Sequence, residues 1–246
     1  MPFGWLRRLS GKRRSAAANR DLGLCLAFVA GAANAGGFLA VHQYTSHMTG
    51  IVSALADDVA LGHWRLAWGA LLALGSFIAG AAACALLVNW ARLRNLQSEF
   101  ALALLCEAVL LLLFGLVGAY LSAHWGVLLT IALLCFIMGL QNAIITKISQ
   151  AQIRTTHVTG LVTDIGIELG RALYWNQPGQ PAVRADWGKC RLLLSLLAMF
   201  FIGGVLGALG FKHIGFAATI PLAIFLLIAA VAPVLEDMLA RWRAGA

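Results

Sequence analysis

Two similar stretches of sequence decide the fold: GAANAGGFLAVHQYTSHMTG at residues 31–50 and GLQNAIITKISQAQIRTTHVTG at residues 139–160. Each begins with G-x-x-N-A and ends with T-[ST]-H-x-T-G, and the second is two residues longer. An acid follows each final glycine by eight residues, and FIAG at residues 77–80 matches FIGG at residues 201–204. Matches that occur in the same order in both halves of the chain indicate an internal duplication.

The composition places the chain in a membrane. Of the 246 residues, 61% are hydrophobic and only 11% are charged, whereas a typical soluble domain has about 25% charged residues. Six continuous apolar runs each approach the length of about 20 residues that crosses a bilayer as a helix. They occupy residues 22–41, 66–90, 100–121, 126–146, 192–211 and 216–234. Their continuity favours helices over the alternating strands of a membrane β-barrel.

The formal charge of +8 is unevenly placed along the chain. With the N-terminus in the cytoplasm, 16 of the 18 Lys and Arg residues fall in inside segments, and only Arg65 and Lys212 fall outside. Such a bias orients a membrane protein and brings basic residues to anionic lipid headgroups. We therefore expect both termini in the cytoplasm, the lipid bilayer as the partner of the basic residues, and no nucleic-acid partner.

The duplication predicts an all-α integral membrane fold of six transmembrane helices, three in each repeat. An odd number of spans makes the second repeat enter from the opposite side of the membrane, so the repeats are inverted. The expected organisation is a basic cytoplasmic tail at 1–20, repeat one at 21–122, repeat two at 123–237 and a cytoplasmic tail at 238–246. Residues 174–190 are an expected cytoplasmic insertion in repeat two.

A short half-helix is expected after each His-x-Thr-Gly element, at residues 51–61 and 161–173. Both segments are too short to span and have helical apolar spacing, and the Ser and Thr residues before them suit N-capping. Two placements remain open. Each half-helix can be re-entrant, beginning at mid-depth beside a watery cavity, or lie flat at the interface. The spacing of Asp164, Glu168 and Arg171 is that of a solvated helical face.

The expected solute pathway is built on the two elements and the polar residues near them. Helix N-termini supply free N–H groups and partial positive charge, and histidine can donate, accept or titrate near neutrality. Amides within spans either contact a solute or join helices. The pathway residues are His47, Thr49, Gly50, His157, Thr159, Gly160, Asn34, Asn142 and Glu107, and a second tier comprises Asp58, Asp164, Glu168 and Gln141.

Glu107 stands alone in the apolar run FALALLCEAVLLLLFGL. Ionisable groups within a membrane are costly and are therefore functional candidates, so Glu107 is a proton carrier or a cation contact. The alternative is a hydrogen bond to another helix that serves assembly. The third span of repeat two, FAATIPLAIFLLIAAV, has no corresponding acid, and its Pro221 is expected to kink that helix.

Several classes of protein are disfavoured by missing motifs. The five cysteines are scattered without a C-x-x-C or Cys/His spacing, so no metal and no cofactor is expected. The chain has no G-x-S-x-G and no H-E-x-x-H, so we do not expect an enzyme. Gly203 and Gly207 form a G-x-x-x-G pair that can pack helices within one chain or in a homo-oligomer, and both alternatives remain open.

The paired H-x-T-G elements with N-A upstream resemble the YoaK-like bacterial membrane family of unknown function, from about residue 21 to about residue 237. The resemblance implies a multi-spanning protein of the bacterial inner membrane and supplies no catalytic residue. Family members commonly have S-H-M-T-G-N at the first element, whereas Ile51 follows Gly50 here.

The sequence predicts a small-solute transporter or channel with a midplane site at the repeat interface. The half-helix ends favour an anionic or dipolar solute, whereas Glu107 favours a proton or cation, and both remain open. The alternative function is a non-transporting membrane scaffold or sensor that binds a partner protein.

Overall fold

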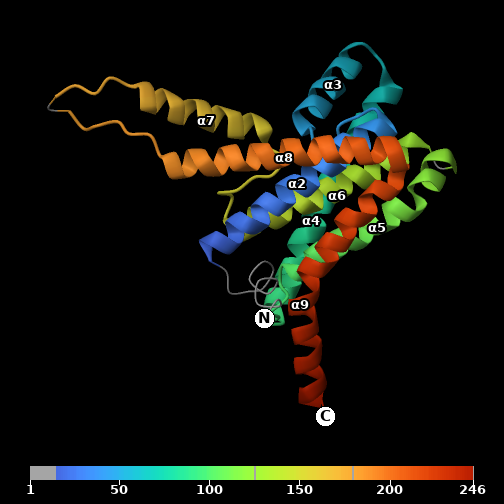
Figure 1. The fold of residues 1–246 in the computed structure, drawn as a ribbon. Helices are drawn as coiled ribbons and strands as arrows, with labels where there is room; N and C mark the ends of the chain where they lie inside the picture. The colour runs from blue at the N-terminus through green and yellow to red at the C-terminus, as the bar shows by residue number, and fades with distance from the viewer. Residues whose placement is uncertain (1–14, 125, 179, 246) are drawn as a thin grey trace.

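The computed structural model describes residues 15–124, 126–178 and 180–245, so most of the basic N-terminal tail lies outside the described residues. The described chain contains only helices and the loops between them (Figure 1). The elements are α2 (Ala16–Val41), α3 (Met48–Ala60), α4 (Trp64–Leu93), α5 (Ala101–His124), α6 (Val127–Ser149), α7 (Val158–Leu173), α8 (Trp187–Ile214), the 3-10 turn η1 (Gly215–Ala218) and α9 (Thr219–Gly245).

Among the described residues, five segments are long and apolar enough to cross a membrane. They are Ala16–Val41, Trp64–Leu93, Ala101–Tyr120, Val127–Ser149 and Trp187–Leu239. The last has 53 residues and contains α8, η1 and most of α9, a stretch that the sequence predicts as two separate spans. The chain changes direction at η1, where the end of α8 passes into α9 (Figure 1). The helices therefore support a multi-pass membrane protein.

The long helices pair across the two halves of the chain. The first helix of the first half, α2, packs along α8 of the second half, and α6 packs along α4 in the same way. The remaining long helices, α5 and α9, pack on each other. The first helix of each predicted repeat thus packs on the second long helix of the other repeat. Neither half therefore forms its core without the other.

Glycines bring the backbones together where α2 crosses α8. A Cβ atom on Gly31 would overlap the carbonyl oxygen of Phe200, and one on Gly203 would overlap the carbonyl oxygen of Phe28. Backbone atoms cannot rotate away as side chains can, so this crossing requires residues without a Cβ. Small residues serve this purpose in membrane helix pairs because they let the backbones approach.

The same contact recurs where α4 crosses α6. Gly80 faces the carbonyl oxygen of Phe136, and Gly139 faces that of Phe77. By these contacts, residues 77–80 correspond to residues 200–203. The letters FIGG predict a match to residues 201–204, so the structural match is one residue earlier. The phenylalanine at position 200 next to the one at 201 permits both alignments in sequence, and only the facing carbonyls distinguish them.

The expected kink at Pro221 is wrong. Pro221 lies in the first turn of α9, which begins at Thr219. In the first turn of a helix the missing N–H of proline has no intrahelical partner to lose, and the fixed φ suits the helix. Pro233 is the proline within the helix interior.

Candidate functional site

Both long helices that precede a His-x-Thr-Gly element end in the same way. After Val41, His42 takes a left-handed conformation with φ of 56°, and after Ser149, Gln150 does so with φ of 51°. The chain then turns back along the helix it has just left, because left-handed residues at helix ends reverse the backbone. Each His-x-Thr-Gly element therefore lies beside an earlier turn of the long helix that precedes it, α2 or α6.

An asparagine on that earlier turn holds each returning loop. The Asn34 Oδ1 atom accepts hydrogen bonds from the Ser46 backbone N–H at 3.1 Å and from the Ser46 hydroxyl at 2.9 Å. The Asn142 Oδ1 atom accepts from the Thr156 hydroxyl at 2.6 Å. The shared N-A and T-[ST]-H letters of the two stretches therefore encode a tie between helix and loop.

The expected N-capping by Ser and Thr is wrong. The N-cap residues of α3 and α7 are His47 and His157, and neither helix has a side-chain cap hydrogen bond. The hydroxyls of Ser46 and Thr156 are instead engaged by the asparagines. In α3 the Met48 N–H donates to the Ser46 carbonyl at 3.2 Å. No side chain caps the other N–H groups in the first turns of α3 and α7, so these can meet a solute or water.

The glycine of each element makes room for its own histidine. A Cβ atom on Gly50 would overlap the His47 ring, and one on Gly160 would overlap the His157 ring. The imidazole thus lies against the first turn of the half-helix, where a residue with a side chain would displace it. This contact explains why a glycine stands three residues after the histidine in both elements.

His157, the histidine of the second element, accepts a hydrogen bond from an arginine. Its Nδ1 atom lies 3.2 Å from the Nη1 atom of Arg154. A guanidinium group only donates, so Nδ1 accepts and the proton of neutral His157 is on Nε2. His157 therefore keeps one N–H donor for another partner.

The two elements meet at one open pocket of about 950 Å³, called here the central pocket. Six of the predicted pathway residues line it: Asn34, His47, Thr49, Asn142, His157 and Thr159. The apolar part of the lining comes largely from the two long helices α4 and α8, with Phe77, Leu197, Phe200, Phe201 and Val205. Among the described residues that line the central pocket there is no acidic side chain.

The central pocket lies beside the middle of both long helices. Phe77 is the fourteenth of the 30 residues of α4, and Phe200 is the fourteenth of the 28 residues of α8. The half-helices begin at this level and pack along the same long helices, α3 on α4 and α7 on α8. Each element thus starts halfway along the long helix that follows it in the chain.

The acids that follow the elements lie at the far ends of the half-helices, away from the central pocket. The Asp58 Oδ1 atom is 3.4 Å from the Nδ1 atom of His63, the residue before α4. The Glu168 Oε2 atom accepts from the N–H of Asp186 at 2.9 Å, just before α8. Both acids therefore fasten the end of a half-helix to the start of the next long helix.

Glu168 is also part of an ion-pair group at the end of α7. Its side chain is fully buried and its Oε1 atom lies 2.9 Å from Arg171 Nη1. Asp164 pairs with Lys189 at 3.3 Å, and both side chains are 43% exposed. Exposed pairs add little stability, so Glu168 is the principal anchor, and Asp164 lies on the open side of the helix.

Glu107 and Gln141 are also absent from the lining of the central pocket. Glu107 is fully buried in α5, and neither carboxylate oxygen has a hydrogen-bond partner within the described part of the chain. The Gln141 Nε2 group donates to the Leu26 carbonyl at 3.2 Å, which joins α6 to α2. Gln141 therefore joins two helices, whereas no hydrogen bond among the described residues gives Glu107 such a structural role.

Residues that the sequence reasoning missed complete the site. Tyr44 lines the central pocket and stacks on Phe38 with ring centroids 4.5 Å apart. Ser46 and Thr156 also line it. The repeat in the sequence could have pointed to these positions. Residues 46 and 156 each stand one residue before a histidine of the two elements, and residues 44 and 154 each stand three residues before it.

Comparison with known proteins identifies a family and nothing more specific. No curated protein matches the chain, and no solved structure matches it. One family, described as "Protein of unknown function (DUF1275)", matches residues 22–232, which is most of the chain. The resemblance to YoaK-like proteins predicted this result, because they are members of that family. This multi-helix membrane protein, with its two His-x-Thr-Gly elements at one pocket, therefore belongs to the DUF1275 family.

Proposed function

We propose that the protein is a transporter or channel for a small solute, and that the central pocket is its binding site. One observation carries the proposal. The two His-x-Thr-Gly elements, 110 residues apart in sequence, contribute the same residue types to a single pocket. A site at the interface between repeats, formed by broken helices, is a recurring plan of membrane transporters.

The proposed architecture has six crossings and two inverted repeats in the bacterial inner membrane, with both termini in the cytoplasm. The 53-residue apolar segment that contains α8 and α9 supports two crossings. As one straight helix it would be about 80 Å long at 1.5 Å per residue, far more than the roughly 30 Å of the hydrocarbon core. The reciprocal pairing of α2 with α8 and of α6 with α4 supports a two-fold relation between the halves.

Topology reporters test this architecture. We expect reporters fused after Ala123 and after Gly215 to be periplasmic, and reporters fused after Gln180 and at the C-terminus to be cytoplasmic. The measurement is paired alkaline phosphatase and fluorescent-protein activity in bacterial cells. A cytoplasmic result at Gly215 would mean that α8 and α9 do not cross separately. A periplasmic result at Gln180 would end the proposal of inverted repeats.

Distances along the chain support re-entrant half-helices. From His157 to Glu168 a helix rises about 17 Å, and from Trp187 to Phe200 it rises about 20 Å, at 1.5 Å per residue. The packing of α7 on α8 and the bond from Glu168 to Asp186 set these segments side by side. If α8 crosses the bilayer, α7 begins near mid-depth and ends at the surface, and α3 does the same beside α4.

The lining of the central pocket favours an anionic or dipolar solute with an apolar part. Two uncapped helix N-termini and the His157 N–H present positive potential, and the described lining has no acidic side chain to attract a cation. Phe77, Phe200 and Phe201 add apolar surface to the same lining. Since Glu107 does not line the pocket, the case for a cation at this site is weaker than the sequence alone indicated.

A stability screen on purified protein tests solute binding. We expect small organic carboxylates to raise Tm and the corresponding amines to leave it unchanged, because a ligand stabilises the folded state by about 2.7 kcal/mol at a hundred times its Kd. The His157→Ala variant should lose the shift. The His213→Ala variant is the matched control, because His213 is an exposed histidine outside the pocket. A screen without any shift, or with equal shifts in both variants, would favour the scaffold or sensor.

A further inference from the structure

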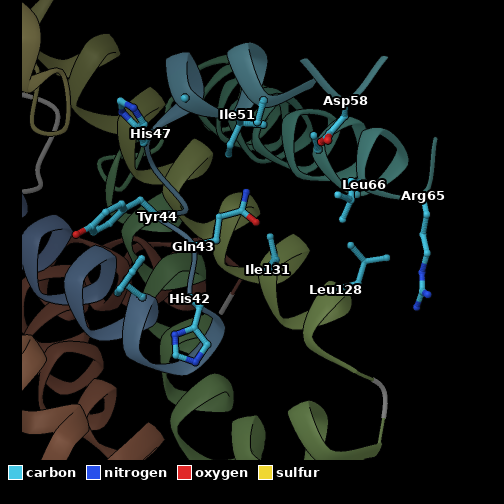
Figure 2. A pocket seen from close by; sticks show the side chains of 15 residues that line it. His42, Gln43, Tyr44, His47, Ile51, Asp58, Arg65, Leu66, Leu128 and Ile131 are labelled. Atoms are coloured by element: carbon cyan, nitrogen blue, oxygen red, sulfur yellow. The ribbon is translucent and has the colours of Figure 1, made fainter. Parts of the chain in front are cut away.

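A second pocket, called here the outer pocket, has a volume of about 580 Å³ and adjoins the central pocket. It lies between the break after α2, the half-helix α3 and the first turns of α4 and α6 (Figure 2). Its polar lining comprises His42, Gln43, Tyr44, His47, Asp58 and Arg65. Ile51, Leu66, Leu128 and Ile131 supply apolar surface.

The position of the outer pocket is set by helix ends. It is bounded by the C-terminal end of α2 and by the N-terminal ends of α4 and α6. In the proposed topology, on which this inference rests, all three ends lie on the periplasmic side. Figure 2 shows Asp58 and Arg65 at the end away from Tyr44, and Gln43 in between. Arg65 is exposed and is the second residue of α4, so in that topology the end with Asp58 and Arg65 is the one nearer the periplasmic surface.

Two side chains line both pockets, Tyr44 and His47. The Tyr44 ring stacks on Phe38 at an interplanar angle of 22°, and nearly half of its surface is exposed. The His47 ring lies against Gly50, which itself lines the outer pocket. These two side chains are therefore the part of the lining at which the two pockets adjoin.

The corresponding contacts of the second element are tighter. At the position of Tyr44 stands Arg154, whose guanidinium contacts His157. At the position of Asp58 stands Glu168, which is buried and bonded to Arg171 and Asp186. Tyr44 contributes an aromatic stack where the second element has a charged hydrogen bond. At these two positions the first element therefore has an aromatic stack and a 3.4 Å contact from Asp58 to His63, where the second element has hydrogen bonds.

We propose that the outer pocket is the periplasmic vestibule of the central pocket, and that Tyr44 and His47 form the gate between them. The vestibule takes the same small, polar or anionic solute as the central pocket. Arg65 lies at the end nearer the periplasmic surface and is one of only two basic residues expected on the outside. Movement of the Tyr44 ring off Phe38 opens the passage without disturbing the α2–α8 or α4–α6 crossings.

Cysteine labelling tests the route without any transported solute. The reporter is a Thr159→Cys variant, because Thr159 lines the central pocket and not the outer one. The probe is a membrane-impermeant anionic methanethiosulfonate, which matches the proposed solute in charge and is added outside spheroplasts, and the unsubstituted protein gives the background of native thiols. We expect the Thr159→Cys thiol to react from outside. Added Tyr44→Ala should speed the reaction several-fold, and Gln43→Trp, which fills the vestibule, should slow it several-fold.

A matched control and a second gate variant keep the test decisive. Ser53→Trp places the same bulk on α3 at an exposed position outside both pockets and should leave the rate unchanged. Tyr44→Leu replaces Tyr44→Ala if the latter is not monodisperse. Equal rates in all variants, or a Thr159→Cys thiol that reacts only from the cytoplasmic side or not at all, would overturn the vestibule and gate. Solute binding is measured separately by the Tm shift, so the route and the binding site can fail independently.

Discussion

Gly31→Leu is expected to destroy the packing of α2 on α8 and to leave little monodisperse protein. A Cβ atom at this position overlaps the carbonyl oxygen of Phe200, which is fixed in the α8 backbone. Overpacking a core usually costs about 1–3 kcal/mol when side chains can shift. Here two helix backbones must separate along their whole contact, so the loss is expected to exceed that range. Size-exclusion chromatography and thermal unfolding in detergent measure it.

The matched control for Gly31→Leu is Gly75→Leu. Gly75 is an exposed residue within α4, and a Cβ atom added there would have no neighbouring atom within 4 Å, so leucine at this position is expected to fit without moving a backbone. Its Tm should stay near that of the unsubstituted protein. Gly139→Leu, at the corresponding crossing of α4 and α6, should behave like Gly31→Leu. Equal losses at Gly31 and Gly75 would show that the crossing does not depend on close backbone contact.

Glu107→Met is expected to raise the stability of the protein. The Glu107 carboxyl is fully buried, and neither oxygen has a hydrogen-bond partner within the described residues. An unsatisfied buried polar group costs about 1–3 kcal/mol, and methionine has a similar length without that cost. We expect an increase of that order in the free energy of unfolding, measured by chemical or thermal unfolding in detergent.

Glu99→Met provides the contrast. Glu99 is also buried, but its Oε2 atom lies 3.3 Å from the Nε atom of Arg92. Removal of that partner leaves Arg92 without its carboxylate, so this variant should be destabilised. A stability loss in Glu107→Met as large as that in Glu99→Met would reveal a stabilising partner for Glu107. A gain would indicate that the acid is kept for a role other than assembly, such as carrying a proton.

Solute binding by a Glu107→Gln variant separates two roles of the acid. Because Glu107 does not line the central pocket, binding of a carboxylate there should be unchanged in the Tm screen. Proton-coupled uptake, in contrast, needs a group that can release its proton, and glutamine cannot. Binding without coupled uptake would place Glu107 in the coupling step rather than in the solute site.

Several features of the fold were predictable because they are local. The length of the apolar runs sets the spans, and the breaks after residues 41 and 149 follow from the polar stretches between helices. The start of α7 at Val158, just after His157, agrees with the half-helix expected there. Local rules failed where a tertiary partner competed, as at Ser46, whose hydroxyl bonds Asn34 instead of capping α3.

The sequence by itself determined that this is a helical membrane protein of the DUF1275 family with two copies of one polar element. Only the tertiary structure decided that the two copies meet at one pocket, and that Glu107, Asp58 and Glu168 lie away from it. Apolar length and repeated letters are properties of short segments. His47 and His157 come together instead because α2 packs on α8 and α6 packs on α4. The glycine contacts that fix these pairs join residues far apart in the sequence and form only when the helices pack.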